Sequence, residues 1–262
     1  MYDFNYQRAA SVDDASSKHK AASDARYLAG GMTLIPVLKQ RLDQPSDLVD
    51  LADVKDLVGI SEENGAIVIK AMTKHSDVEN SELVKSKIPA LAELAGTIGD
   101  PMVRNRGTIG GSLANSDPAA SYPSAVLALN ATIHTDKRTI AADDFFQGMF
   151  TTALEPGELI TKVSFPIPQT AGYKHFPNPA SRFPIVGAFV AQTKDGVRVA
   201  ITGAGPCAFR VPEFEKALAG GLDPNKIKDI KVSADGLNTD IHASAEYRAH
   251  LINVMARRAM GG

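Results

Sequence analysis

The chain of 262 residues has few of the residues that form disulfides or bind metals. Cys207 is its only cysteine, which excludes a disulfide framework and a cysteine-ligated iron–sulfur cluster within this chain. Its six histidines are scattered without HxxxH or HxH spacing, so we expect no metal site. Any redox chemistry in this chain would therefore depend on an organic cofactor.

Long hydrophobic runs and an excess of charge of one sign are also absent. No apolar run approaches the roughly 20 residues that a membrane-spanning helix needs, so we expect no membrane span. The first residues, MYDFNYQRAASVDD, lack the apolar core of a signal peptide, which favours a cytoplasmic location. A net charge of -2 argues against electrostatic binding of nucleic acid.

The first fifty residues follow a β-α-β-α-β pattern. Short apolar segments at 4–7, 25–29 and 47–51 predict strands. Ser11 is a good N-cap for a helix that extends to about residue 23, and residues 32–42 have close to helical spacing of their apolar side chains. Strands that alternate with helices favour a small parallel sheet.

The pattern changes after residue 53 and predicts an α+β fold. Strands are expected at 65–71 and 158–168, with a hairpin across Asp136-Lys137 and helices beginning at Pro89 and Pro118. A segment rich in Pro, Ser and Gly predicts a boundary near Gln169. Beyond it we expect a hairpin at 185–205, a helix closed by glycine, and a final helix capped by Ser244.

Two Gly-Gly pairs suggest a site for an anion. Gly30-Gly31 lies between a predicted strand and a predicted helix, and Gly110-Gly111 lies within RNRGTIGGSLANSDPAASYPSA. Glycine lets backbone N–H groups approach a phosphate and allows unusual dihedral angles. Hydroxyl and amide side chains near both pairs offer further donors, so the two loops together are expected to clamp a pyrophosphate. A single Gly-Gly pair is more often a plain turn.

A third glycine motif competes with this interpretation. The sequence VRVAITGAGPCA places Gly203, Gly205 and Ala208 at the spacing of a dinucleotide-binding fingerprint after a predicted strand. Pro206 and Pro212 would break the helix that this fingerprint requires, and no further βα units follow. We therefore expect a structural turn there.

Three segments together carry a family resemblance: LAGGMTLIPVLKQRL, RNRGTIGGSLANSDPAASYPSAVLAL and YKHFPNPASRFPIVGAFVA. In this order and combination they resemble the FAD-binding medium subunit of the molybdenum hydroxylases, the family of carbon monoxide dehydrogenase and xanthine dehydrogenase. The resemblance covers nearly the whole chain. It implies a two-part FAD-binding domain of the vanillyl-alcohol-oxidase type at 1–169, with subdomains at about 1–55 and 56–169. An antiparallel-sheet-and-helix domain at 170–262 would follow.

The resemblance also implies which residues contact FAD, and it implies no catalytic acid, base or nucleophile. The family usually has Asp-Pro-Ala-Ala-Asp, whereas this chain has Ser121 in place of the last Asp, so that carboxylate contact would be lost and Asp117 would have to compensate. The implied FAD contacts are Tyr27, Leu28, Ala29, Gly30, Gly31, Met32, Thr33, Leu34, Ile98, Thr108, Ile109, Gly110, Gly111, Ser112, Asn115, Asp117, Ser121, Ile160 and Lys174.

The function implied by the resemblance is electron transfer. Electrons would come from the [2Fe-2S] clusters of a small partner subunit, after oxidation of a substrate on a large molybdopterin-binding subunit, and would leave through FAD to NAD, a quinone or oxygen. The resemblance implies a dimer of heterotrimers. Two alternatives stay open: a self-sufficient small flavin oxidase, and a nucleotide-binding module without redox function.

Overall fold

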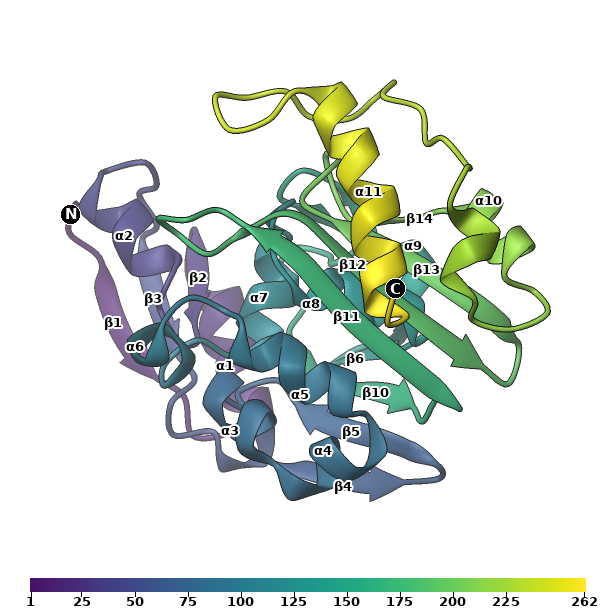
Figure 1. The fold of residues 1–262 in the computed structure, drawn as a ribbon. Coiled ribbons are helices and arrows are strands. Elements are labelled where there is room, and N and C mark those ends of the chain that lie inside the picture. The colour runs from purple at the N-terminus through teal and green to yellow at the C-terminus, as the bar shows by residue number, and fades with distance from the viewer.

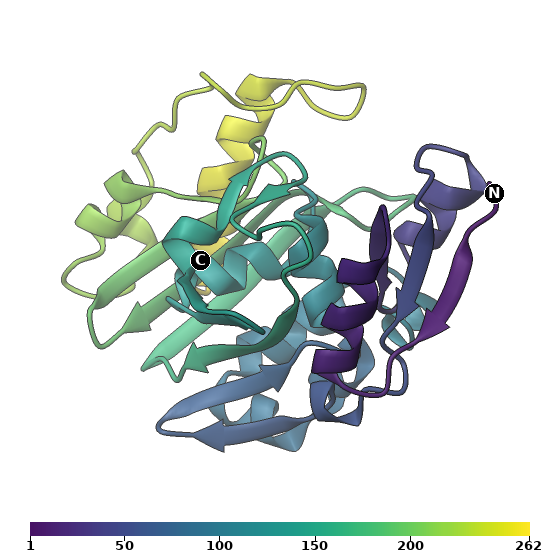
Figure 2. The same cartoon turned by 180° about the vertical axis from the view of Figure 1, so that it is seen from behind.

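The computed structural model describes residues 1–262 and contains three sheets and one small hairpin (Figure 1). The N-terminal unit consists of β1 (Asn5–Arg8), α1 (Val12–Ala21), β2 (Ala25–Leu28), α2 (Leu34–Lys39) and β3 (Asp47–Asp50). Both β1 and β2 pair with β3 in parallel, which confirms the expected parallel sheet. The two crossovers run in opposite directions, so right-handed connections place α1 and α2 on opposite faces of the sheet (Figure 1 and Figure 2).

Helix α1 begins where the sequence indicates. The side chain of Ser11 accepts a hydrogen bond from the backbone N–H of Asp14 at 3.1 Å, which satisfies one of the free donors of the first turn. Ala15 is fully buried and packs with Val49 and Leu51 of the sheet in a small core. The N-terminal unit is therefore held together by few apolar side chains.

A five-stranded antiparallel sheet follows, in the order β4-β5-β10-β6-β7. The predicted hairpin across Asp136-Lys137 is confirmed, because β6 and β7 pair around it. Helix α5 begins at Pro89 as expected, and α7 packs against β5 and β10. The strands are β4 (Ile60–Glu63), β5 (Ala66–Lys70), β6 (Thr132–Thr135), β7 (Thr139–Ala141) and β10 (Ile160–Pro166), with η1 (Lys55–Leu57), α9 (Ala142–Phe145), β8 (Phe146–Gly148) and β9 (Thr151–Thr152) beside them. The helices between β5 and β6 are α3 (His75–Asn80), α4 (Glu82–Lys87), α5 (Pro89–Gly96), α6 (Pro101–Arg104), α7 (Ile109–Asn115) and α8 (Tyr122–Ala128).

The C-terminal part is a four-stranded antiparallel sheet covered on both faces. Helix α11 packs on β11 and β12, while α5 and α8 pack on the other side (Figure 1). The Ser244 side chain caps α11 as predicted, by accepting from the N–H of Tyr247 at 3.3 Å. The elements are β11 (Thr170–Pro177), β12 (Pro184–Thr193), β13 (Gly196–Thr202), β14 (Phe209–Arg210), α10 (Pro212–Ala217), η2 (Pro224–Ile227) and α11 (Ala245–Ala259).

One expected element start is wrong, and one strand was not expected. No helix begins at Pro118: the Asp117 carboxylate accepts from the N–H of Ala119 at 2.8 Å in a turn, and α8 begins at Tyr122 with Pro123 in its first turn. No strand was expected in the Pro-, Ser- and Gly-rich segment, but β11 occupies residues 170–177 and pairs along its length with β12. Its prolines lie at the strand end, where a lost N–H is tolerated.

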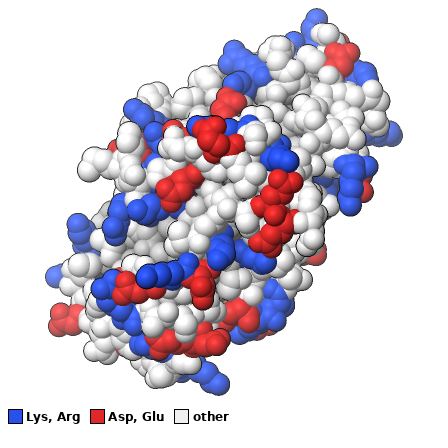
Figure 3. All heavy atoms as spheres, turned by 90° about the horizontal axis from the view of Figure 1, so that it is seen from below, with Lys and Arg blue, Asp and Glu red and all other residues white.

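One large core joins the five-stranded sheet to the C-terminal sheet. Tyr173, Phe189 and Ala200 of the C-terminal sheet belong to the same buried cluster as Ile67 and Ile133 of the five-stranded sheet. The division near Gln169 therefore stays a prediction, since the two predicted domains share their largest core. The surface shown in Figure 3 carries positive and negative side chains interspersed, without a field of one sign. None of the helices has the length and apolarity required to cross a membrane.

The dinucleotide-like motif at residues 203–208 is a turn, as expected. Gly203 has φ +83, and a Cβ there would stand 2.5 Å from the carbonyl oxygen of Pro184. Its N–H donates to the carbonyl of Pro118 at 2.8 Å. This glycine therefore serves close packing between the C-terminal sheet and the turn before α8.

Candidate functional site: a cavity between two glycine loops

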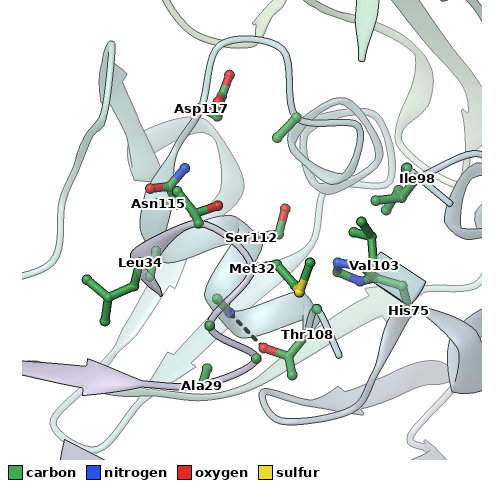
Figure 4. Close-up of a pocket in the computed structure, with 18 of the residues that line it drawn as sticks. Ala29, Met32, Leu34, His75, Ile98, Val103, Thr108, Ser112, Asn115 and Asp117 are labelled. Atoms are coloured by element: carbon green, nitrogen blue, oxygen red, sulfur yellow. Dashed lines mark hydrogen bonds between the residues drawn. The ribbon is translucent and has the colours of Figure 1, made fainter. Parts of the chain in front are cut away.

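A cavity of about 460 Å³ lies where the N-terminal unit, the helices α5 to α8 and the β11–β12 loop meet (Figure 4). That volume falls within the range of roughly 300–1,000 Å³ typical of small-molecule and cofactor pockets. Fourteen of the residues implied by the resemblance line it: Tyr27, Ala29, Gly30, Gly31, Met32, Thr33, Leu34, Ile98, Thr108, Gly111, Ser112, Asn115, Asp117 and Ser121.

The first glycine loop, residues 30–34, forms one wall and leaves its backbone donors free. None of the five N–H groups from Gly30 to Leu34 donates a hydrogen bond within the protein. Gly31 has φ +74, a conformation that favours glycine. A Cβ on Gly30 would stand 2.7 Å from the carbonyl carbon of Arg106 and closer still to its oxygen. Gly30 therefore lets the first loop approach the segment that leads into the second.

The second glycine loop, residues 108–112, has a different internal structure. The N–H groups of Ile109, Gly110 and Ser112 donate to the carbonyls of Thr73, Ala71 and Thr108. The N–H of Gly111 donates to Oγ1 of Thr108 at 3.2 Å, shown dashed in Figure 4. The first turn of α7 is thus satisfied by the protein itself, and its backbone is not a ready-made anion site.

Gly110 does not line the cavity and packs inside the protein. Gly110 lies in α7 without a positive φ and is buried. A Cβ there would stand 2.6 Å from the Cβ of Ala71. Gly110 therefore allows α7 to pack closely against the end of β5, and its assignment as an FAD contact stays a prediction. Ile109, which is fully buried, belongs to the same core.

The remaining predicted residues lie away from the cavity lining. Leu28 ends β2, and its Cδ1 would stand 3.3 Å from a Cβ on Gly31. Ile160 is buried in β10, at 3% exposure. Lys174 lies on β11 and forms an ion pair with Glu93, with both side chains about half exposed. Their assignment as FAD contacts stays a prediction that the cavity does not support.

Polar side chains near the second loop offer hydrogen-bond donors to the cavity, whereas the backbone N–H groups of this loop do not. The hydroxyl of Ser112 and the amide of Asn115 make no hydrogen bond within the protein, and neither does the hydroxyl of Thr33 in the first loop. Ser121, which stands where the family usually has Asp, lines the cavity and is 6% exposed. One carboxylate oxygen of Asp117 holds the turn at Ala119. The cavity therefore offers side-chain donors opposite the free N–H groups of the first loop.

The sequence analysis missed several lining residues, of which His75 is the most unusual. Its side chain is 5% exposed, and burial together with the nearby Arg104 cation lowers the pKa of His75 to about 4. No local pattern singled it out, because its position depends on packing of α3 against the chain before α7. The other missed residues are Arg26, Gly99, Val103, Gly107, Ala114, Ala119, Ala120, Arg182, Phe183 and Pro184.

Comparison with known proteins places this chain in a family. The family model described as the FAD binding domain in molybdopterin dehydrogenase matches residues 2–168. The carbon monoxide dehydrogenase medium chain of Afipia carboxidovorans is 36% identical, over 98% of this chain and 95% of that one. The nicotine 6-hydroxylase medium subunit of Paenarthrobacter nicotinovorans is also 36% identical, over 97% and 95%.

Solved structures agree with the sequence comparison. A chain of carbon monoxide dehydrogenase from Hydrogenophaga pseudoflava superposes with a TM-score of 0.91 at 33% identity, covering 99% of this chain and 96% of that one. This likeness confirms the expected fold class and, with the family model, the expected cofactor. The chain belongs to the FAD-binding medium subunits of the carbon monoxide dehydrogenase and xanthine dehydrogenase family of molybdenum hydroxylases, and it is a flavoprotein component of an oxidoreductase.

Proposed function

We propose that the cavity between the two glycine loops holds FAD and that the chain is the electron-transfer subunit of a molybdenum hydroxylase complex. The observation that carries this proposal is the run of five free backbone N–H groups at residues 30–34 on the cavity wall. Phosphate oxygens are strong acceptors, and preorganised N–H groups bind them without further rearrangement. These residues are half-buried or exposed, so their N–H groups are accessible to a ligand from the cavity.

The donor set fits a dinucleotide cofactor. In this proposal the first loop binds the pyrophosphate through its backbone, and Thr33, Ser112 and Asn115 add side-chain donors from both walls. The second loop acts mainly as a rigid support, because its own N–H groups have partners. The free donors lie in one part of the cavity.

The other part of the cavity fits a flat, largely apolar ring. Ile98, Val103 and His75 lie together on one side of the cavity, across from Leu34 and Asn115 of the donor side (Figure 4). Burial of a ring there excludes water from it, and the neighbouring groups influence its electronic properties.

Bound FAD would supply the chemistry that joins one-electron donors to a two-electron acceptor. We propose that the donors are [2Fe-2S] clusters on a small partner subunit and that a large molybdopterin-binding subunit oxidises the substrate. The single cysteine of this chain agrees with clusters held elsewhere. The relatives are named medium chains or medium subunits, which supports assembly with a larger and a smaller chain. We propose a dimer of heterotrimers.

Native purification of the full chain from its source tests this function. We expect two further polypeptides, molybdenum, iron and the absorption of bound flavin, and light scattering should give the mass of two heterotrimers. Flavin reduction should follow addition of the substrate of the complex. Turnover of a simple alcohol or amine by the chain alone would indicate a flavin oxidase. Nucleotide without flavin absorption would indicate a module without redox function.

A further inference from the structure

His75 is held rigidly at the edge of the cavity by groups that leave its ring nitrogens without partners. Its backbone N–H donates to the carbonyl of Gly107 at 3.0 Å, which fixes the start of α3 against the chain before α7. Its ring lies 5.3 Å from the ring of Tyr122, at an angle of 50°. A Cβ on Gly107 would stand 2.6 Å from Nε2 of His75, so the glycine leaves room for the imidazole.

The two nitrogens of this ring have different surroundings. Nδ1 is buried and has no hydrogen-bond partner. Nε2 lies beside Gly107, which itself lines the cavity, and Figure 4 shows the imidazole reaching toward the space opposite Met32. A buried N–H without an acceptor is costly, so the neutral ring carries its proton on Nε2. His75 therefore presents one N–H donor to the cavity.

Nothing in the protein accepts this donor. The cation that affects the pKa of His75 is Arg104, which is paired with Glu79 at 2.8 Å. Neither Arg104 nor Glu79 hydrogen-bonds to His75. The hydroxyl of Tyr122, behind the ring, also has no partner. Val103 and Ile98 line the adjoining wall, so the donor borders the apolar part of the cavity as well as Met32 of the first loop.

We propose that His75 donates a hydrogen bond from Nε2 to an acceptor atom on the isoalloxazine ring of the bound cofactor, which makes it a positioning residue that also tunes the flavin. The proposal rests on the placement of FAD in this cavity. Because the pKa of His75 is lowered to about 4, its imidazole is neutral near pH 7 and donates a hydrogen bond without adding a full positive charge. A donor to an isoalloxazine acceptor stabilises the more electron-rich, reduced form.

The test replaces His75 with Phe, which keeps a ring of similar shape and removes the donor. FAD titrated into the flavin-free full chain should bind the His75→Phe variant about tenfold more weakly than the wild type. The midpoint potential of the bound flavin should fall and its absorption maxima should shift. His75→Gln restores an N–H donor and should recover part of the affinity and of the potential. Tyr122→Phe is the matched control, because it removes the hydroxyl behind the ring and should change neither value.

Equal FAD affinity, potential and spectrum in wild type and His75→Phe would overturn the proposal. A wild-type chain that binds no FAD would instead contradict the cavity assignment itself. Nitrogen NMR of the imidazole gives an answer even if His75→Phe fails to fold. We expect the neutral tautomer with the proton on Nε2, and a change in the Nε2 shift when FAD binds. A proton on Nδ1, or an Nε2 signal that FAD leaves unchanged, would also overturn it.

Discussion

The two glycine loops look alike in sequence and differ in structure. Both carry Gly-Gly between hydroxyl or apolar residues and both lead into a helix. In the first loop the N–H groups of residues 30–34 are free on the cavity wall. In the second loop the N–H groups of residues 109–112 are bonded to carbonyls and to a threonine side chain. This difference supports the proposal that the first pair serves ligand binding, whereas Gly110 of the second pair serves packing.

The individual glycines of the two loops also have different structural roles. Gly30 allows the two loops to approach each other, Gly31 allows a positive φ, and Gly110 allows α7 to approach Ala71. Substitution of Gly30 should therefore act on FAD binding ahead of folding. Substitution of Gly110 should act on folding first.

Gly30→Ala should have the largest effect on FAD. Its new Cβ would overlap the backbone carbonyl of Arg106, which has no flexible side chain to move away, so the loops must separate. We expect FAD affinity to fall by at least about a hundredfold in a fluorescence titration. Gly148→Ala is the control, because its Cβ would meet only Thr151 at 3.8 Å. Retained affinity in Gly30→Ala would break the comparison.

Gly110→Ala should act on the fold. The added methyl group would overpack the contact between α7 and Ala71, at a cost of about 1–3 kcal/mol. Chemical denaturation of the flavin-free chain should show this loss, whereas Gly30→Ala should lower FAD affinity more than stability. If Gly110→Ala left stability unchanged and abolished FAD binding, the second loop would be the phosphate site.

The buried His75 beside the second loop should make stability depend on pH. Its folded pKa, at about 4, lies below the ordinary histidine value, so the unfolded chain binds more protons as the pH falls from about 6.5 toward 4. This group should lower stability by about 2 kcal/mol between pH 7 and pH 5. Denaturation midpoints of His75→Phe should lack that part of the dependence, and Tyr122→Phe should keep it. Identical pH profiles for wild type and His75→Phe would contradict the burial of a neutral ring.

Thr108→Ala and Ser112→Ala should have the smallest effects, one on stability and the other on FAD binding. Loss of the Thr108 hydroxyl leaves the N–H of Gly111 without its cap and should cost about 1 kcal/mol of stability. Loss of the free Ser112 hydroxyl should leave stability nearly unchanged and weaken FAD binding by about fivefold. Thermal melts and flavin titrations of the two variants provide the measurements. The reverse assignment of effects would show that the hydroxyl of Thr108 faces the cofactor.

Local signals in the sequence predicted much of the fold. The N-cap at Ser11, the proline at Pro89 and the turn at Asp136-Lys137 act within a few residues, and the structure confirms all three. β11 was not predicted because its segment is rich in Pro, Ser and Gly. The strand forms through pairing with β12, which lies outside that segment. The start of α8 was misplaced because Pro118 and Pro123 both fit a first turn.

The site was only partly predictable because it also depends on contacts between segments that are distant in the sequence. The Gly-Gly pairs identified two walls of the cavity, but nothing local indicates that Thr73 and Ala71 accept the N–H groups of the second loop. His75, Arg182 and Phe183 reach the cavity through packing of distant elements. Their roles depend on neighbours that periodicity and spacing do not reveal.

Residue-resolved amide hydrogen exchange, with and without FAD, tests the central claim most directly. In the flavin-free chain we expect rapid exchange at the amides of residues 30–34 and protection at residues 109–112. FAD should slow exchange strongly in the first loop and change the second loop little. Fast exchange at Gly110 and Gly111 that becomes slow only with FAD, beside an unchanged first loop, would contradict the account.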